Sequence, residues 1–465
     1  MIRALRPVVS CLLPLLVLVP ANSASASFRS PDAAIKVNRK VGPPTSSTLV
    51  HGRGFRPTEI VDLTFDADAL GSATTDPSGA FQTRIQIPAS ALPGLHEVQA
   101  TGESSRLTAQ APFIVNTDWA MFHFGPARTG FNPVENVLDP SNVSGLHKAW
   151  KFHAVEYDAS VAVVDGVVYV AGTALDALDA RTGATVWSVD FGDLNYTVSS
   201  PAVAYGIVYV CLPVGVFALN AETGAQVWAF STDNRIDASP AVADGVVYVP
   251  SFDGNLYALD AATGTPQWTL RTGAFELSNP AVANGVVYWG SANGTLYALD
   301  GATGATLWTA RVPVAGLAGP AVSHGVVYVE GADGTIYALD AATGHKRWAF
   351  PTPGVIEASP AVANGVVYAA GGYGDRTSVY ALDADTGVKL WTASVFHNHP
   401  TASPVVANGV LYVASPSGRL AALDSATGAK LWLFPAGGAT YSSVAVANGM
   451  VYLASQKGAT FAFGL

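Results

Sequence analysis

From about residue 150 onward, the chain alternates short apolar runs with tight polar turns, and this pattern returns roughly every 40 residues. The clearest copy extends from Ser239 to Trp268 and holds three apolar runs separated by Asp-Gly, Asp-Gly and Thr-Gly turns, before a fourth run that includes Trp268. Such runs predict a four-stranded antiparallel meander. Because a lone meander carries apolar side chains on both faces, only neighbouring copies can cover them. The copies are therefore predicted to close into a ring.

Two recurring motifs give the number of copies. A strand of the type Gly-Val-Val-Tyr occurs eight times, with the tyrosines Tyr169, Tyr209, Tyr248, Tyr288, Tyr328, Tyr368, Tyr412 and Tyr452. The motif Ala-x-Asp-x-x-Thr-Gly-x-x-x-Trp ends at Trp187, Trp268, Trp308, Trp348, Trp391 and Trp432. A variant with Asn220 in place of Asp ends at Trp228, the last unit ends without a Trp, and Trp150 has no unit before it. The strand around Trp150 is therefore predicted to complete the last sheet of an all-β, eight-bladed propeller of four-stranded blades, spanning residues 147–465.

Two segments precede the repeat. Alternating runs between residues 30 and 115, with turn clusters at 52–57 and 76–79, predict a small β-sandwich. It resembles the immunoglobulin-like modules of exported bacterial proteins, which act as spacers or adhesion units. Residues 116–146 are rich in aromatic residues, Pro and Gly, and are predicted to dock on one end of the propeller as a linker. Stacking on a ligand is the alternative role for its aromatic residues, Trp119, Phe122, Phe124 and Phe131.

The first 26 residues have the features of a secretory signal peptide. Arg3 and Arg6 precede an apolar stretch, and small residues lead to a predicted cleavage near Ala24 or Ala26. Roughly 14 apolar residues are too few for the ~20 that span a bilayer, so no transmembrane anchor is predicted. The phrase Val-Val-Ser-Cys ending at Cys11 also fits a bacterial lipoprotein box, and lipidation there remains the alternative. We expect a secreted protein, extracellular or periplasmic.

Charge and cysteine content exclude several classes of partner and site. Loss of the two signal-peptide arginines moves the net charge from −10 to about −12, which disfavours nucleic acid and anionic membrane surfaces. Only 12% of residues are charged and 49% are hydrophobic, which suits short strands better than long helices. Cys211 is the single cysteine of the predicted exported chain, so neither an intramolecular disulfide nor a cysteine metal cluster is expected. Its place in a strand pattern predicts a buried thiol.

The motif that ends in Trp is similar to the tryptophan-docking motif of the pyrroloquinoline quinone (PQQ) repeat. That repeat is found in eight-bladed quinoprotein dehydrogenases and in BamB-type outer-membrane assembly proteins. The Arg-Thr-Gly-Phe and Asn-Val-Ser-Gly-Leu phrases of the linker also resemble the opening segment of such propellers. The resemblance covers about two thirds of the chain and implies that each Trp wedges between blades while the Asp and the Thr-Gly turn hold the hairpin. The eight repeat tryptophans are therefore assigned to structure.

The variable loops of the repeat mark the face on which function is expected. The turns between first and second strands, and between third and fourth, are nearly uniform, whereas the opposite face varies from blade to blade. Variable loops on a rigid scaffold are where binding groups are placed. Because the blade connections lead into the innermost strands, their side chains are predicted to gather at the mouth of the central channel. The candidate ligand-binding residues are Glu156, Tyr157, Asp158, Asn195, Tyr196, Asn234, Arg235, Asp237, Glu276, Asn279, Glu357, His397, Asn398, His399 and Tyr441.

No catalytic constellation is recognisable among these candidates. His397 and His399 form one His-x-His pair, which lacks a third metal ligand at a known spacing, so no metal site is predicted. The sequence contains no Gly-x-Ser-x-Gly elbow, no His-Glu-x-x-His and no phosphate-binding glycine loop. The quinoprotein resemblance would give Arg235 the basic role near PQQ, and Glu276 or Asn279 a calcium contact. However, the chain lacks the adjacent cysteines and the long blade insertions of those enzymes.

The leading hypothesis is a non-catalytic, exported propeller that acts as a binding or scaffolding module at the cell envelope. Its partner would be an envelope protein, a carbohydrate or a small molecule, and no cofactor is predicted. The alternative hypothesis is a quinoprotein dehydrogenase that uses PQQ and calcium to oxidise alcohols or sugars. A role limited to BamB-like outer-membrane assembly is disfavoured, because that family is lipid-anchored and this signal is predicted to be cleaved.

Overall fold

The computed structural model describes residues 33–153, 159–192, 199–274, 278–312, 318–354, 358–373, 376–396, 402–436, 442–455 and 458–465. The signal-peptide prediction lies outside these residues. The chain divides into two compact units, one containing the residues up to Thr117 with Val134–Val137, and the other containing Asp118–Pro133 with Leu138–Leu465. Within the described ranges, no helix has the length and apolarity needed to cross a membrane.

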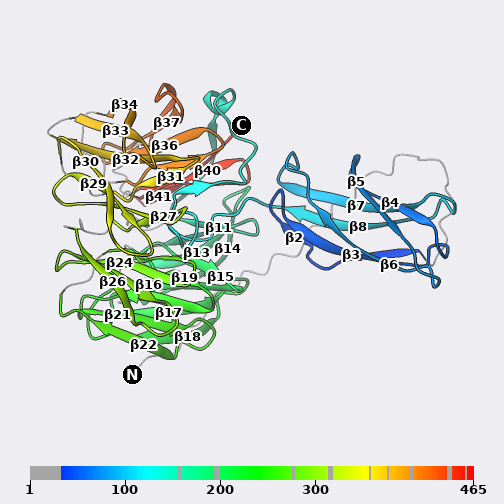
Figure 1. Ribbon diagram of the computed structural model, residues 1–465, viewed down its shortest axis with the longest axis horizontal. Coiled ribbons are helices and arrows are strands. Elements are labelled where there is room, and N and C mark those ends of the chain that lie inside the picture. Colours follow the sequence, from blue (N-terminus) through cyan, green and yellow to red (C-terminus); the bar gives the residue numbers. More distant parts are fainter. Residues whose placement is uncertain are drawn as a thin grey trace. The chain divides into compact units, whose positions relative to one another are not determined.

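The first unit is a sandwich of two sheets around one apolar core (Figure 1). One sheet contains β1 (Ala34–Val37), β3 (Ser47–Arg53) and β6 (Phe81–Gln86). The other contains β2 (Val41–Gly42), β8 (Thr108–Val115), β7 (Gly94–Gly102), β4 (Ile60–Phe65) and β5 (Asp68–Thr74). Buried and exposed positions alternate along β3, β4 and β8, as expected when one sheet face meets a core and the other meets water. The predicted β-sandwich is confirmed.

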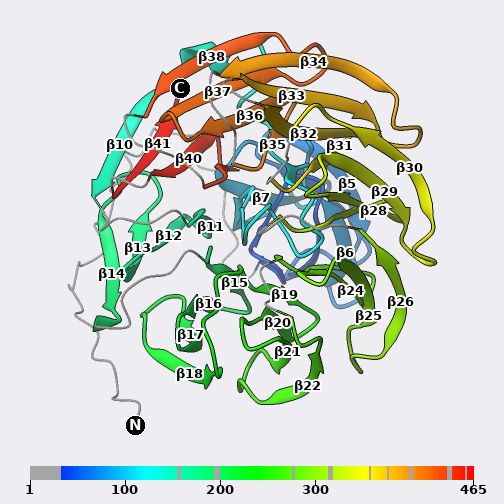
Figure 2. The same ribbon diagram turned by 90° about the vertical axis from the view of Figure 1, so that its left-hand side faces the viewer.

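The second unit is a ring of eight sheets, numbered here as blades 1 to 8 in the chain order of their innermost strands (Figure 2). The innermost strands are β11 (Ala162–Val164), β15 (Ala202–Ala204), β19 (Ala241–Ala243), β23 (Ala281–Ala283), β27 (Ala321–Ser323), β31 (Ala361–Ala363), β35 (Val405–Ala407) and β39 (Ala445–Ala447). The second strands are β12 (Val167–Ala171), β16 (Ile207–Leu212), β20 (Val246–Pro250), β24 (Val286–Ser291), β28 (Val326–Glu330), β32 (Val366–Tyr373), β36 (Val410–Ser415) and β40 (Met450–Ser455).

The outer half of each blade is built in the same order. The third strands are β13 (Ala174–Asp179), β17 (Gly215–Asn220), β21 (Asn255–Asp260), β25 (Thr295–Asp300), β29 (Thr335–Asp340), β33 (Arg376–Asp383), β37 (Arg419–Asp424) and β41 (Ala459–Gly464). The outermost strands are β14 (Thr185–Asp190), β18 (Gln226–Ser231), β22 (Pro266–Arg271), β26 (Thr306–Arg311), β30 (Lys346–Pro351), β34 (Lys389–Phe396), β38 (Lys430–Pro435) and β10 (His147–His153). The all-β propeller predicted from the repeat is confirmed.

The ring is closed by a strand from the start of the propeller unit. β10 pairs antiparallel with β41, and Trp150 lies opposite Ala462, so blade 8 combines one N-terminal strand with three C-terminal ones. The 3-10 helix η1 (Val143–Gly145) directly precedes β10. Because residues separated by more than 300 positions share one sheet, the two ends of the repeat array are tied together by backbone hydrogen bonds.

Neighbouring blades are joined by a repeated pair of hydrogen bonds. The indole N–H of Trp228 donates to the carbonyl of Ala261 at 2.9 Å, and the hydroxyl of Tyr209 donates to the same oxygen at 3.0 Å. The pair recurs between successive blades, as for Trp308 and Tyr288 on the carbonyl of Ala341. Each tyrosine ring lies about 6 Å from its tryptophan. At every junction except the one from blade 7 to blade 8, one backbone oxygen therefore anchors two aromatic side chains from the blade before it.

The Asp-x-x-Thr-Gly turn shapes the surface that receives the tryptophan. Asp260 accepts hydrogen bonds from the backbone N–H and the hydroxyl of Thr263, and these bonds lower the pKa of the Asp260 carboxyl. Asn220 accepts the equivalent bonds from Thr223, which explains why an amide replaces the carboxylate in one blade. An acceptor oxygen, not a charge, is what this position requires.

The glycine of this turn gives the first testable prediction. Gly304 has φ of +71° and a Cβ there would lie 2.7 Å from the Trp268 ring, whereas Gly285 has φ of +74° with nothing within 4 Å. Gly285→Ala should cost about 1–2 kcal/mol of stability from backbone strain alone. Gly304→Ala should cost about 1–3 kcal/mol more, because the indole must move. Urea unfolding of both variants measures the difference, and equal losses would show that the Trp contact carries no energy.

Candidate functional site

A segment of the propeller unit crosses the ring at its innermost strands, and we call Asp118–Pro133 the plug segment. Its carbonyls at Ala120, Pro126, Ala127, Thr129 and Gly130 accept hydrogen bonds from one residue of β15, β23, β27, β31 and β35, respectively. Trp119 and Val163 of β11 exchange two backbone hydrogen bonds. The side chain of Asn132 donates from Nδ2 to the Val446 carbonyl of β39. Within it, β9 (Phe131–Asn132) pairs with β35 in parallel. The plug segment therefore satisfies inner-strand groups that would otherwise face the channel.

Arg128 ties the plug segment to blades 3 and 4. Its side chain is fully buried and donates from Nε to the Pro280 carbonyl at 3.0 Å and from Nη2 to the carbonyls of Ser239 and Pro240. Nη1 donates to the Phe122 carbonyl at 2.7 Å. Burial lowers the pKa of Arg128 to about 9, so the guanidinium remains charged at neutral pH. Carbonyl dipoles thus solvate this buried cation in place of water.

A second ring of hydrogen bonds runs around the end of the channel nearest the variable loops. We call it the channel belt. At six of the equivalent positions, the backbone N–H donates to the side-chain oxygen of the next blade, as from Ser160 to Ser200 at 2.9 Å and from Ser443 to Ser160 at 2.8 Å. The remaining links join Ser200 to Ser239, Ser239 to Asn279, Gly319 to Ser359 and Ser359 to Ser403.

The channel belt explains the place of Asn279, one of the residues predicted to bind a ligand. Asn279 is only 5% exposed, and its side-chain oxygen accepts the Ser239 N–H at 2.6 Å. In blade 4, the Asn279 side chain therefore accepts the hydrogen bond that a serine hydroxyl accepts in most other blades. The next position is Gly319, where a Cβ would lie 2.4 Å from the Asn279 carbonyl oxygen. The described contacts of Asn279 thus connect blades.

Three other predicted residues lie together in the connection that leads into β19 of blade 3. The Arg235 guanidinium lies 4.3 Å from the centre of the Phe252 ring, and its Nε is 3.2 Å from Asp237 Oδ2. Its backbone N–H donates to the Asn234 side chain. Burial raises the pKa of Asp237, and the charge of Arg235 opposes this shift. Stacking and pairing hold the half-exposed guanidinium in one orientation, which suits recognition of a carboxylate or a carbonyl.

The other candidate residues fall outside the described ranges, so their convergence on one pocket stays a prediction. They are Glu156, Tyr157, Asp158, Asn195, Tyr196, Glu276, Glu357, His397, Asn398, His399 and Tyr441. The described part of the proposed mouth is therefore the group formed by Asn234, Arg235, Asp237 and Phe252.

Sequence reasoning missed a fully buried carboxyl group in blade 5. Glu330 ends β28, and neither of its oxygens has a hydrogen-bond partner among the described residues. Burial alone raises the pKa of Glu330 well above its ordinary value. Comparing repeats in register would have found it, because the other blades carry a small residue, a cysteine or a proline there. These are Ala171, Cys211, Pro250, Gly290, Ala370, Ala414 and Ala454.

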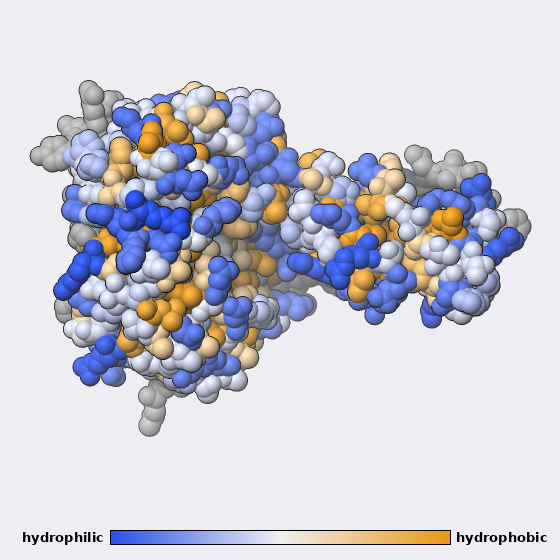
Figure 3. Space-filling view, viewed as in Figure 1, coloured by the Kyte–Doolittle hydropathy of each residue, from blue (hydrophilic) through white to orange (hydrophobic). Residues whose placement is uncertain are grey.

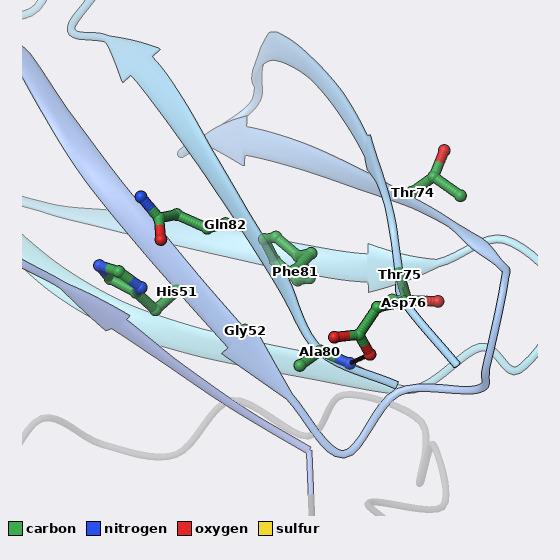
Figure 4. A pocket seen from close by; sticks show the side chains of 8 residues that line it. All are labelled: His51, Gly52, Thr74, Thr75, Asp76, Ala80, Phe81 and Gln82. Carbon is green, nitrogen blue, oxygen red and sulfur yellow. Dashed lines mark hydrogen bonds between the residues drawn. The ribbon is translucent and has the colours of Figure 1, made fainter. Parts of the chain in front are cut away.

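The sandwich carries a hollow of about 470 Å³ that no sequence pattern indicated (Figure 4). His51 of β3 and Gln82 of β6 lie opposite each other in the sheet register and point to one side of the hollow. Phe81 lies at its centre and is 7% exposed. One carboxylate oxygen of Asp76 already accepts backbone hydrogen bonds within its own turn, and the Phe81 ring is largely buried. The hollow therefore offers a ligand few free hydrogen-bonding groups and little aromatic surface.

Exposed apolar residues recur on the outer strands, directly before the docking tryptophans. Val186 is 41% exposed, Val227 47%, Leu307 54% and Leu390 52%. Figure 3 shows apolar residues as small patches between hydrophilic ones on the face in view. Scattered apolar positions of this kind are normal for a soluble surface, so they mark no binding face on their own.

The described residues do not fit PQQ with calcium. PQQ is a planar quinone with three carboxylates, and its calcium partner needs a set of oxygen ligands. No group of three or more His, Cys, Asp or Glu side chains that would hold a metal occurs in the described part of the chain. Arg128 already donates to four carbonyls, and burial raises the pKa of the Cys211 thiol to about 12. We therefore derive no redox step through this group.

The repeat and its docking motif define a class of eight-bladed propellers, and the comparisons name the family. Residues 147–212, 171–279, 272–377 and 375–464 match the family described as outer membrane protein assembly factor BamB. The matched ranges cover more than half of the chain, so this protein belongs to that family.

Curated relatives match over short stretches. The outer membrane protein assembly factor BamB of Burkholderia pseudomallei is 34% identical over 103 residues, which is 22% of this chain and 26% of the relative. The quinohemoprotein alcohol dehydrogenase of Comamonas testosteroni is 29% identical over 153 residues, which is 28% of this chain and 22% of that enzyme. The matches thus span about a quarter of each relative.

Solved structures support the fold alone, since their sequence identity is low. BamB from Moraxella catarrhalis has a TM-score of 0.60 and 21% identity, over 69% of this chain and all of its own. A europium-containing methanol dehydrogenase has a TM-score of 0.67 and 15% identity, over 75% of this chain and 98% of its own. Similar propellers therefore occur in an assembly factor and in an enzyme.

The channel belt gives a matched pair of mutations. Ser359→Ala removes the acceptor of the buried Gly319 N–H and should cost about 1–3 kcal/mol in the free energy of unfolding. Ser443 occupies the equivalent position, yet its hydroxyl has no partner among the described residues. Ser443→Ala should therefore change stability by less than about 0.5 kcal/mol. Chemical denaturation of both variants tests the belt, and equal effects would contradict it.

Glu330 gives a prediction about pH. Its pKa is raised in the folded protein, so the protonated form is favoured there, and stability is lost as pH rises from the ordinary value of 4.5 toward the folded pKa. Glu330→Gln removes the titrating group and should flatten this loss. Melting temperatures of the wild type and of this variant at pH 5, 7 and 9 measure the effect, with the exposed Glu222→Gln as control. Parallel curves for all three proteins would show that Glu330 is not buried as described.

Proposed function

We propose that this protein is an exported, non-catalytic propeller that acts as a binding or scaffolding module at the cell envelope. One observation carries the proposal: the plug segment and the channel belt occupy the inner surface of the ring with the chain's own hydrogen bonds. A channel wall used in this way is a rigid support. The groups left free for a partner are on the variable loops.

The partner is proposed to be an envelope protein that contacts the variable face. The match to an outer membrane protein assembly factor supports this class of partner. Arg235 is the contact group we propose within the described part of the face, because Phe252 and Asp237 hold its guanidinium in place. A carbohydrate or a small molecule is the other kind of ligand that such loops would take. Export through the predicted N-terminal signal fits a site of action outside the cytoplasm.

A quinoprotein dehydrogenase is the second candidate function. The similarity to the quinohemoprotein alcohol dehydrogenase of Comamonas testosteroni favours it. In that case, the undescribed blade connections would have to supply calcium ligands, since no group of three or more His, Cys, Asp or Glu side chains that would hold a metal occurs among the described residues. The buried Arg128 would then have only a structural role, because its donors are already used.

A cofactor titration separates the two candidates. Purified full-length protein is mixed with PQQ and calcium chloride, and its melting temperature and the reduction of an electron-accepting dye by ethanol or glucose are measured. We expect neither a rise in melting temperature nor dye reduction, because the described residues include no group of side chains that would hold the calcium ion. A tightly bound cofactor at 100 times its dissociation constant would add about 2.7 kcal/mol of stability and raise the melting temperature clearly.

The two readouts of this titration are independent. A melting shift with dye reduction would overturn the non-catalytic proposal. Calcium alone and PQQ alone serve as controls, because a shift with only one of them would indicate a binding site without the dehydrogenase activity.

A further inference from the structure

The plug segment begins with a carboxyl group that touches two blades at once. Asp118 is the first residue of the propeller unit after Thr117. Its Oδ1 accepts the backbone N–H of Asp165, in the turn between β11 and β12 of blade 1, at 3.2 Å. The side chain of Asn448, in the turn between β39 and β40 of blade 8, also hydrogen-bonds to it. Asp118 therefore bridges the first and last blades.

The same carboxyl faces a second carboxylate. The Asp165 side chain interacts with Asp118 by like-charge repulsion, and the Tyr169 hydroxyl of β12 lies within the field of both. These are the titratable groups described around Asp118, and Asn448 is neutral. The next residue, Trp119, exchanges two backbone hydrogen bonds of 2.7 Å with Val163 of β11 and is fully buried. When Asp118 is protonated, the repulsion between the Asp118 and Asp165 carboxylates is absent. When Asp118 is ionised, this repulsion acts directly beside Trp119.

We propose that Asp118 is a proton-operated latch that holds the start of the plug segment on the seam between blades 1 and 8 when neutral and loosens it when ionised. The neutral carboxyl keeps its bonds to Asp165 and Asn448 without repulsion. The ionised carboxylate stays half-buried beside a like charge, which favours release into water. The loosened part is the pair Asp118 and Trp119, since the plug segment from Ala120 onward is held by other blades.

The direction of the pH effect follows from the raised pKa. Burial first, and the Asp165 charge second, raise the pKa of Asp118 from 3.8 to about 7. A carboxyl with a raised folded pKa stabilises the closed state fully below pH 4, and this contribution is lost as pH rises toward 7. The latch therefore loosens between about pH 4 and pH 7. This regulation is independent of which partner binds the variable face.

Hydrogen exchange of the full-length protein tests the latch. Amide exchange of the peptide that contains Trp119 and Met121 is followed by mass spectrometry at pH 5.0 and 7.5 and corrected for the intrinsic pH dependence. We expect at least about tenfold faster exchange at pH 7.5. Asp118→Asn keeps an acceptor oxygen but cannot ionise, so its exchange should be equal at both pH values. The peptide of β40 in blade 8 should show no pH effect in either protein.

A second variant keeps the test decisive even if Asp118→Asn folds poorly. Asp165→Asn removes the repelling charge but leaves Asp118 free to titrate, so the acceleration between pH 5.0 and 7.5 should become clearly smaller. The proposal is overturned if the wild-type peptide exchanges equally at both pH values. It is also overturned if Asp118→Asn keeps the full acceleration, or if Asp165→Asn leaves it unchanged.

Discussion

The propeller depends on one repeated contact, in which a single backbone oxygen of each blade accepts an indole and a hydroxyl from the blade before it. This contact needs a flat surface without a side chain, and the glycine of the Thr-Gly turn provides it. In blade 8 the turn is missing, and Trp432 donates instead to the Leu146 carbonyl of the segment that leads into β10. At the junction between blades 7 and 8, the Trp432 bond to Leu146 therefore replaces the bond to a turn carbonyl that joins the other blades.

This construction leaves little of the inner surface free. Residues of seven innermost strands hydrogen-bond to the plug segment, and six belt positions bond to the next blade. Even a charged side chain is used for this internal bonding, because the buried guanidinium of Arg128 donates to backbone carbonyls of two blades. Arg235 differs from Arg128, because its half-exposed guanidinium stacks on Phe252 and keeps one side open to water.

Local repetition made the fold predictable, whereas the site depends on contacts between blades. Trp and Tyr at fixed spacing predicted the strands and the propeller, and Trp150 in β10 follows the count of motifs. A polar side chain such as Asn279 could bind a ligand or hold the fold together, and its sequence position does not distinguish the two. Its bond to Ser239 of the neighbouring blade is visible only in the structure. Glu330 and Gly319 are exceptions within their repeat positions. Glu330 is fully buried, and a Cβ at position 319 would lie 2.4 Å from the Asn279 carbonyl oxygen of the preceding blade.

We propose that partners contact the variable face of a ring whose innermost strands already hydrogen-bond to the plug segment. Site-specific photo-cross-linking in cells that export the protein tests it most directly, with the photoreactive residue at position 235 on the variable face or at position 303 in the uniform turn of blade 4. The account predicts a defined cross-linked envelope partner from position 235 and none from position 303. Cross-linking from position 303 alone, or equally from both positions, would contradict it.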